Sequence, residues 1–127
     1  NVSATTLPNS LFYNKQKLTS AVLPSTLINT GTYTFENCSS LTDITLPDGL
    51  ETIGNEAFDN CEKLQNITIP QSVTVIGSYA FYYCSALKNI VIPANVTTIQ
   101  NSTFYGCTAL ESVTLPENIT SIGYIFY

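Results

Sequence analysis

Apolar residues recur along the chain in columns with a period of 23 residues, and this period organises the whole sequence. One column holds aromatic rings, namely Phe12, Phe35, Phe58, Phe81, Phe104 and Tyr127. Another holds prolines, namely Pro24, Pro47, Pro70, Pro93 and Pro116. A unit this short cannot cover its own apolar positions, so stacked units must bury a continuous core between neighbours. The period predicts one solenoid domain, residues 1–127, with repeats 1–23, 24–46, 47–69, 70–92 and 93–115, which we number coils 1 to 5, and a partial coil 116–127.

Each coil carries two short extended segments and one tight turn. In coils 3 and 4, Leu64–Pro70 alternates polar and apolar residues and is rich in β-branched side chains, which is typical of a strand. Its proline cannot donate a ladder hydrogen bond and should end the strand. Val73–Gly77 predicts a second extended segment, in which the glycine permits a positive φ at the following corner. Ala80–Cys84 predicts a single helical or 3₁₀ turn, because it is too short for an α-helix.

The unit from Leu64 to Cys84 resembles the BspA-like leucine-rich repeat, also called the Treponema-type repeat, and the resemblance extends over the whole chain. It implies a mostly β, right-handed leucine-rich-repeat arc with a parallel β-sheet on the concave face and short turns or 3₁₀ segments outside. Such repeats are known from surface and secreted proteins of bacteria and parasitic protists, so the resemblance also implies adhesion. The departures from the pattern are local, and they are Pro8, Lys15, Thr30, Gln100 and Phe126.

Composition excludes several functions. Four Lys plus Arg against nine Asp plus Glu give a net charge of −5, which repels nucleic acid. No apolar run approaches the ~18 residues that a membrane span needs, so we expect no transmembrane segment. The absence of histidine removes the usual general base and zinc ligand. We therefore predict no enzyme, no cofactor, and no catalytic or metal-binding residue.

Two groups of residues have a possible chemical role that the repeat makes less probable. Glu36 and Asp59 share a column on adjacent coils, as two ligands of a calcium site would, but solvated acids on an outer turn are the favoured interpretation. The cysteines also form a column, in which in-register side chains point the same way rather than at each other. We expect free, buried thiols at Cys38, Cys61, Cys84 and Cys107.

Two surfaces are candidates for ligand binding. Residues that alternate with the core columns of the first strand should form the exposed concave face, and they are Asp43, Thr45, Asn66, Thr68, Asn89, Val91, Ser112 and Thr114. The side chains of this face are small and mostly polar, and the face is nearly neutral. A secondary patch on the outer turns comprises Tyr82, Tyr83 and Tyr105, because tyrosines are enriched at binding surfaces.

These features favour a non-catalytic module of an extracellular or cell-surface protein, which binds a protein or glycan ligand and serves adhesion. A passive spacer that presents another domain is the alternative. An ice-binding sheet is less favoured, because Val22 and Val91 interrupt the threonine column and an arc is not flat. The last apolar columns have no polar cap, so we also predict end-to-end self-association through Leu110, Val113, Leu115, Ile119 and Ile122.

Overall fold

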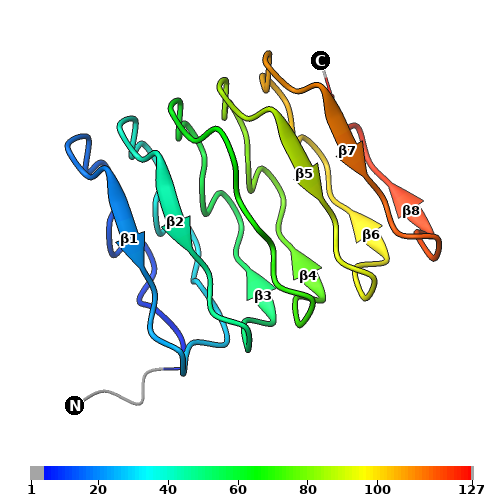
Figure 1. The fold of residues 1–127 in the computed structure, drawn as a ribbon, viewed down its shortest axis with the longest axis horizontal. Helices are drawn as coiled ribbons and strands as arrows, with labels where there is room; N and C mark the ends of the chain where they lie inside the picture. The colour runs from blue at the N-terminus through cyan, green and yellow to red at the C-terminus, as the bar shows by residue number, and fades with distance from the viewer. Residues whose placement is uncertain (1–4, 127) are drawn as a thin grey trace.

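The computed structural model describes residues 5–126, which form a stack of similar coils whose order in space follows their order in the sequence (Figure 1). The described residues contain eight short strands and no helix. The strands are β1 (Ser20–Val22), β2 (Asp43–Thr45), β3 (Thr52–Ile53), β4 (Val75–Ile76), β5 (Asn89–Val91), β6 (Thr98–Ile99), β7 (Ser112–Thr114) and β8 (Ser121–Ile122). The predicted mostly β solenoid is confirmed.

The strands form two parallel ladders, one for each extended segment of the coil. In the first ladder β1 pairs with β2 and β5 with β7, and an isolated bridge joins Asn66 to Asn89. In the second ladder β3 pairs with β4 and β6 with β8, and Asn29 bridges both Thr6 and Thr52. Every partner lies 23 residues away, so equivalent side chains of neighbouring coils lie side by side.

The glycines after the second strand are required by close packing rather than by a positive φ, so that part of the sequence interpretation was wrong. A Cβ on Gly54 would overlap with the backbone carbonyl of Gly31 in the preceding coil, and one on Gly77 would overlap with the backbone of Asn55. Of the glycines in this column, only Gly31 has a positive φ, at 81°. The second ladder is interrupted between β4 and β6, beside the position where Gln100 replaces glycine.

The outer segments are irregular turns, and no 3₁₀ helix occurs among residues 5–126. Within each turn, cysteine N–H groups donate to the phenylalanine carbonyl three residues before, as Cys61 does to Phe58 at 3.2 Å. Left-handed residues lie on either side of the phenylalanine, with φ of 52° at Glu56 and 56° at Asn60. These left-handed positions prevent the turn from continuing as a helix.

The core is a continuous stack of phenylalanine rings flanked by aliphatic columns. Phe35, Phe58 and Phe81 are fully buried, and adjacent rings lie 5.4 and 5.5 Å apart with interplanar angles of 1° and 5°. The predicted last member of this column, Tyr127, lies outside the described residues. Phe126, expected at the alanine position, stacks on Phe104 at 6.2 Å instead. The main-chain N–H of Phe104 donates its hydrogen bond to the carbonyl of Ile125 rather than to that of residue 126. The register of the last coil is therefore shifted by one residue.

The cysteines form a second continuous column beside the phenylalanine stack. All four are free and buried, as predicted. Each thiol donates a hydrogen bond to the phenylalanine carbonyl 26 residues before it, as Cys84 does to Phe58 at 3.1 Å. Burial raises the pKa of the Cys84 thiol well above its usual value, and nearby Cys61 and Cys107 raise it further.

Because the thiolate is the reactive form, buried thiols of raised pKa should react slowly in the folded chain. Under native conditions at neutral pH we expect Cys61 and Cys84 to resist alkylation, whereas denaturation without a reductant should expose four thiols. Mass spectrometry after both treatments measures this directly. Two or fewer modified thiols in the denatured sample would mean disulfides and contradict the ladder.

Both ends of the stack present apolar side chains. At the far end Leu110 and Val113 are half-buried, while Leu115 and Ile122 are 38% and 48% exposed. These residues are the ones from which the sequence predicts end-to-end association, and the association itself stays a prediction.

Candidate functional site

The structure places the predicted sheet-face residues together on one surface. We call this surface the sheet face; it comprises Asp43, Thr45, Asn66, Thr68, Asn89, Val91, Ser112 and Thr114, and all eight are exposed. Parallel register keeps Asn89 beside Ser112, whose hydroxyl donates to the Asn89 side-chain oxygen at 2.7 Å. Repeated short polar side chains at the spacing of adjacent strands can make several hydrogen bonds to one extended partner.

The sheet face carries little charge. Asp43 is its one charged member, and the exposed residues Lys88 and Glu111 directly precede β5 and β7. The lysine and the two acids leave the surface close to neutral, which provides no long-range steering of a charged ligand. Val91, which is 56% exposed, adds a small apolar contact near the centre.

The predicted tyrosine patch is also assembled, and it contains one member that the sequence analysis missed. Tyr82 stacks on Tyr105 with ring centroids 5.1 Å apart and meets Tyr83 edge-on at 4.6 Å. Tyr79 packs edge-on against Tyr82 at 5.4 Å. It was missed because it stands in a different repeat column, and the turn brings that column beside the one that contains Tyr82. We call Tyr79, Tyr82, Tyr83 and Tyr105 the tyrosine cluster.

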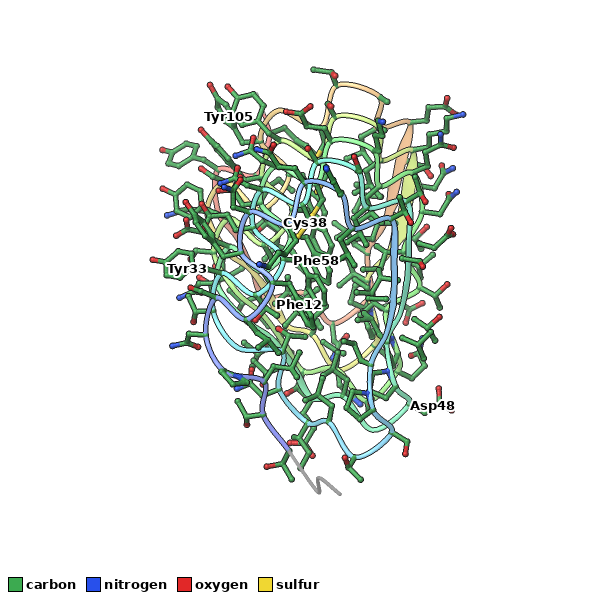
Figure 2. All side chains as sticks on the ribbon, turned by 90° about the vertical axis from the view of Figure 1, so that its left-hand side faces the viewer. Phe12, Tyr33, Cys38, Asp48, Phe58 and Tyr105 are labelled. Carbon is green, nitrogen blue, oxygen red and sulfur yellow. The ribbon has the colours of Figure 1, made fainter. Side chains whose placement is uncertain are left out.

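The sheet face and the tyrosine cluster lie on opposite sides of the core. Figure 2 shows Tyr33 and Tyr105 on one side of the stack, Phe12, Phe58 and Cys38 in its interior, and the strands of the first ladder on the far side. A ligand of moderate size that covers one surface therefore leaves the other free, and substitutions on the two surfaces can separate their roles.

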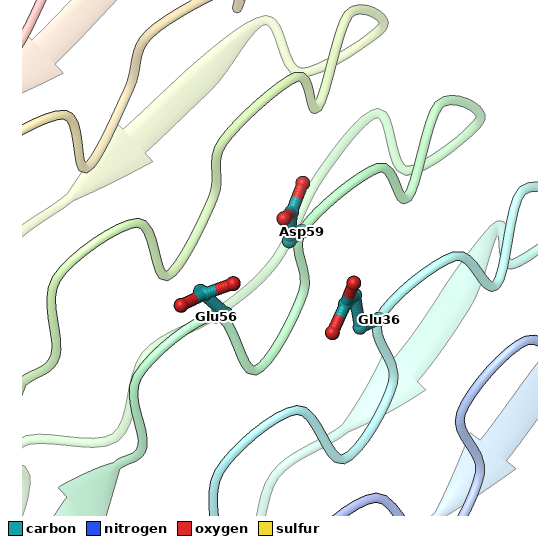
Figure 3. Close-up of side chains that lie close together, drawn as sticks. All are labelled: Glu36, Glu56 and Asp59. Carbon is teal, nitrogen blue, oxygen red and sulfur yellow. The ribbon is translucent and has the colours of Figure 1, made fainter.

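Three carboxylates converge on the turn side, next to the tyrosine cluster (Figure 3). Glu36, Glu56 and Asp59 each bring an oxygen to within 4.8 Å of the others. Asp59 is only 8% exposed, so its interpretation as a solvated acid was wrong. The main chain at Asp59 lies between coils 2 and 4. The N–H of Asn37 donates to the Asp59 carbonyl, and the N–H of Asn60 donates to the Tyr82 carbonyl, each at 2.8 Å.

Asp59 should make the stability of the chain depend on pH. Burial, with a smaller contribution from Glu36 and Glu56, raises its pKa from 3.8 to about 7. As the pH rises, the unfolded chain therefore releases this proton first, and the folded state is favoured most below pH ~4. Between pH ~4 and ~7 the free energy of unfolding should fall by up to ~1.4 kcal/mol per pH unit.

Asp59→Asn should reduce this fall and be more stable than the unsubstituted chain at pH 8. A smaller part of the fall should remain, because burial also raises the pKa of Glu36. Urea unfolding of both proteins between pH 4.5 and 8 measures the difference. The matched control is Asp48→Asn, because Asp48 is exposed and lies on the opposite side of the stack from Tyr33 (Figure 2). Parallel stability profiles for the unsubstituted chain and Asp59→Asn would show that Asp59 titrates normally.

Two parallel ladders, 23-residue coils and a buried ring stack define a leucine-rich-repeat solenoid. The profile described as BspA type leucine rich repeat region matches residues 5–127 in six copies. The chain belongs to this family, whose repeats generally serve as non-catalytic binding modules. No curated protein sequence matches it significantly.

Solved structures of bacterial proteins are similar over nearly the whole chain. The leucine-rich repeat protein of T. pallidum has a TM-score of 0.86, 32% identity and covers 96% of this chain and 64% of its own length. A leucine-rich repeat protein from Bacteroides ovatus has a TM-score of 0.87 and 34% identity, covering 94% of this chain and 31% of its own. A leucine rich cell surface protein from Faecalibacterium prausnitzii has a TM-score of 0.84 and 36% identity, covering 93% and 32%.

The chain thus spans 64% of the T. pallidum protein and about a third of the other two. Within residues 5–126, no helix is long and apolar enough to cross a membrane.

Proposed function

We propose that the chain is a non-catalytic recognition module of a surface or secreted protein, and that it binds a protein or glycan ligand through the sheet face in adhesion. The observation that carries this proposal is the exposure of all eight sheet-face residues, which repeat at the same two positions on four successive coils. Repeated surfaces of solenoids let several coils contact one partner at once. The similarity to a cell surface protein of Faecalibacterium prausnitzii supports an extracellular location.

The sheet face is favoured over the tyrosine cluster because it extends over more coils. The face contains residues from coils 2 to 5, whereas the tyrosine cluster is confined to coils 4 and 5. The rings of that cluster also pack on one another, so part of their surface is already used in the fold. A passive spacer would use neither surface.

The test is a binding screen on immobilised glycans and extracellular proteins with the unsubstituted chain and two double variants. Asn66→Arg with Asn89→Arg adds bulk and charge at the centre of the sheet face without touching the core. We expect this variant to bind a detected ligand at least about tenfold more weakly, equal to ~1.4 kcal/mol. Because the face is nearly neutral, affinity should change little between low and physiological salt.

Tyr82→Ala with Tyr105→Ala is the matched control on the opposite surface. It should retain the affinity of the unsubstituted chain. If the tyrosine variant abolishes binding while the arginine variant leaves it unchanged, the tyrosine cluster is the site. A chain that binds nothing in the screen would favour the spacer.

A further inference from the structure

The carboxylate cluster on the turn side does not fit a purely structural role. Elsewhere in the chain, its two repeat columns hold mostly tyrosine and serine, as Tyr82 and Tyr79 show. In coils 2 and 3 the same positions hold Glu36, Glu56 and Asp59. Nearby like charges disfavour one another's ionised forms, so three neighbouring acids cost stability unless something neutralises them.

The fold itself supplies no positive charge to this cluster. The chain has four basic residues, Lys15, Lys17, Lys63 and Lys88, all of them in the described part, and none forms an ion pair with these acids. The pKa of Asp59 is raised by its burial and by both glutamates, with no lowering contribution from a cation. The cluster therefore consists of one buried and two half-buried carboxyl groups with no cation paired to them.

One carboxylate oxygen of Asp59 is buried and has no hydrogen-bond partner. More than nine-tenths of this residue is buried, and it lies in the group whose oxygens approach within 4.8 Å of one another (Figure 3). Unsatisfied buried polar atoms are rare in folded proteins, and a bound ion or water is one of the few explanations for such an atom. This unpaired oxygen is evidence for a bound ion that is independent of the spacing, because three solvated carboxylates could lie equally close together without binding one.

We propose that Glu36, Glu56 and Asp59 form a Ca²⁺ site that links coils 2 and 3 on the turn side of the solenoid. Ca²⁺ binds oxygen ligands at about 2.3–2.6 Å, so two ligands of one ion are at most ~5 Å apart. The spacing of the three oxygens satisfies this limit. Main-chain carbonyls and water would complete the six to eight ligands that the ion takes.

The donor set selects a hard cation. All three side chains offer carboxylate oxygens, and the chain has no histidine. The cysteines donate to main-chain carbonyls in the core, so they are not available as soft ligands. Mg²⁺ requires near-octahedral geometry with ligand oxygens at ~2.0–2.1 Å. Three side chains from two separate coils suit the more adaptable coordination geometry of Ca²⁺ better. With three protein carboxylates we expect a Kd on the order of 10⁻⁴–10⁻³ M.

The test uses Tb³⁺ as a luminescent probe and Ca²⁺ as its competitor, at pH 8. Tyr82 lies one coil from Asp59, and the chain lacks tryptophan, so tyrosine excitation should sensitise Tb³⁺ bound at the cluster. Emission should saturate and be displaced by millimolar Ca²⁺. Asp59→Asn and Glu56→Gln should each weaken Tb³⁺ and Ca²⁺ binding at least about tenfold, since loss of even an outer-shell partner of a metal has effects of that size.

Asp48→Asn is the matched control, since it removes the same charge from an exposed position away from the cluster, and it should leave both affinities unchanged. Glu56→Gln decides the test if Asp59→Asn fails to fold, because Glu56 is only half-buried. Equal affinities in Glu56→Gln and Asp48→Asn, or no displacement by millimolar Ca²⁺, would overturn the proposal. Displacement by Mg²⁺ at a lower concentration than Ca²⁺ would overturn the assignment to calcium.

Discussion

Phe58→Ala is expected to lower the free energy of unfolding by about 3–5 kcal/mol. Phe58 is fully buried, and its ring stacks on Phe35 and Phe81 at 5.4 and 5.5 Å. Removal of the ring leaves a cavity between coils and breaks the stack at its centre, so both neighbouring coils lose contacts. Urea or thermal unfolding of the purified variant measures the effect.

The matched control is Tyr124→Ala, because Tyr124 is an aromatic residue that is 89% exposed. Its substitution should change stability by less than about 0.5 kcal/mol. A loss below about 1 kcal/mol for Phe58→Ala would place the ring column outside the core and contradict the coil geometry.

Gly54→Ala is expected to destabilise the chain by about 1–3 kcal/mol, although it adds one methyl group. The new Cβ would overlap with the carbonyl of Gly31, which is main chain and cannot rotate away. Coils 2 and 3 would have to separate at this corner to make room for the methyl group.

Gly49→Ala is the control, because a Cβ at Gly49 meets nothing within 4 Å. This substitution should be neutral or stabilise the chain by up to ~1 kcal/mol, since alanine restricts the unfolded chain. Equal unfolding free energies for the two variants in urea would show that the close contact between coils does not determine the glycine column.

The period of 23 residues was sufficient to predict the solenoid, the ring stack and the exposed sheet face, because each depends on which residues share a column. Parallel pairing at a fixed offset turns a column in the sequence into a row in space. The cysteine column was predicted on the same grounds. The hydrogen bonds from its thiols to carbonyls 26 residues away depend on the geometry of the turns, which the period does not give.

The features that escaped sequence analysis depend on contacts between columns. Tyr79 and Glu56 stand in a column three residues before that of Tyr82 and Asp59, and a left-handed turn brings the two together. The burial of Asp59 is not a property of its column, because Tyr13 is exposed and Glu36 and Tyr82 are half-buried. The slip at Phe126 similarly depends on packing at the end of the stack.

Mapping a bound ligand by amide chemical shifts is the most direct test of the claim that the chain recognises a partner through its sheet face. With a ligand from the binding screen, we expect the largest perturbations at Asp43, Asn66, Asn89 and Ser112, with little change at the tyrosine cluster. The four residues share one repeat column on successive coils, so the perturbations should run across the stack. Perturbations confined to Tyr82, Tyr83 and Tyr105 would contradict recognition through the sheet face.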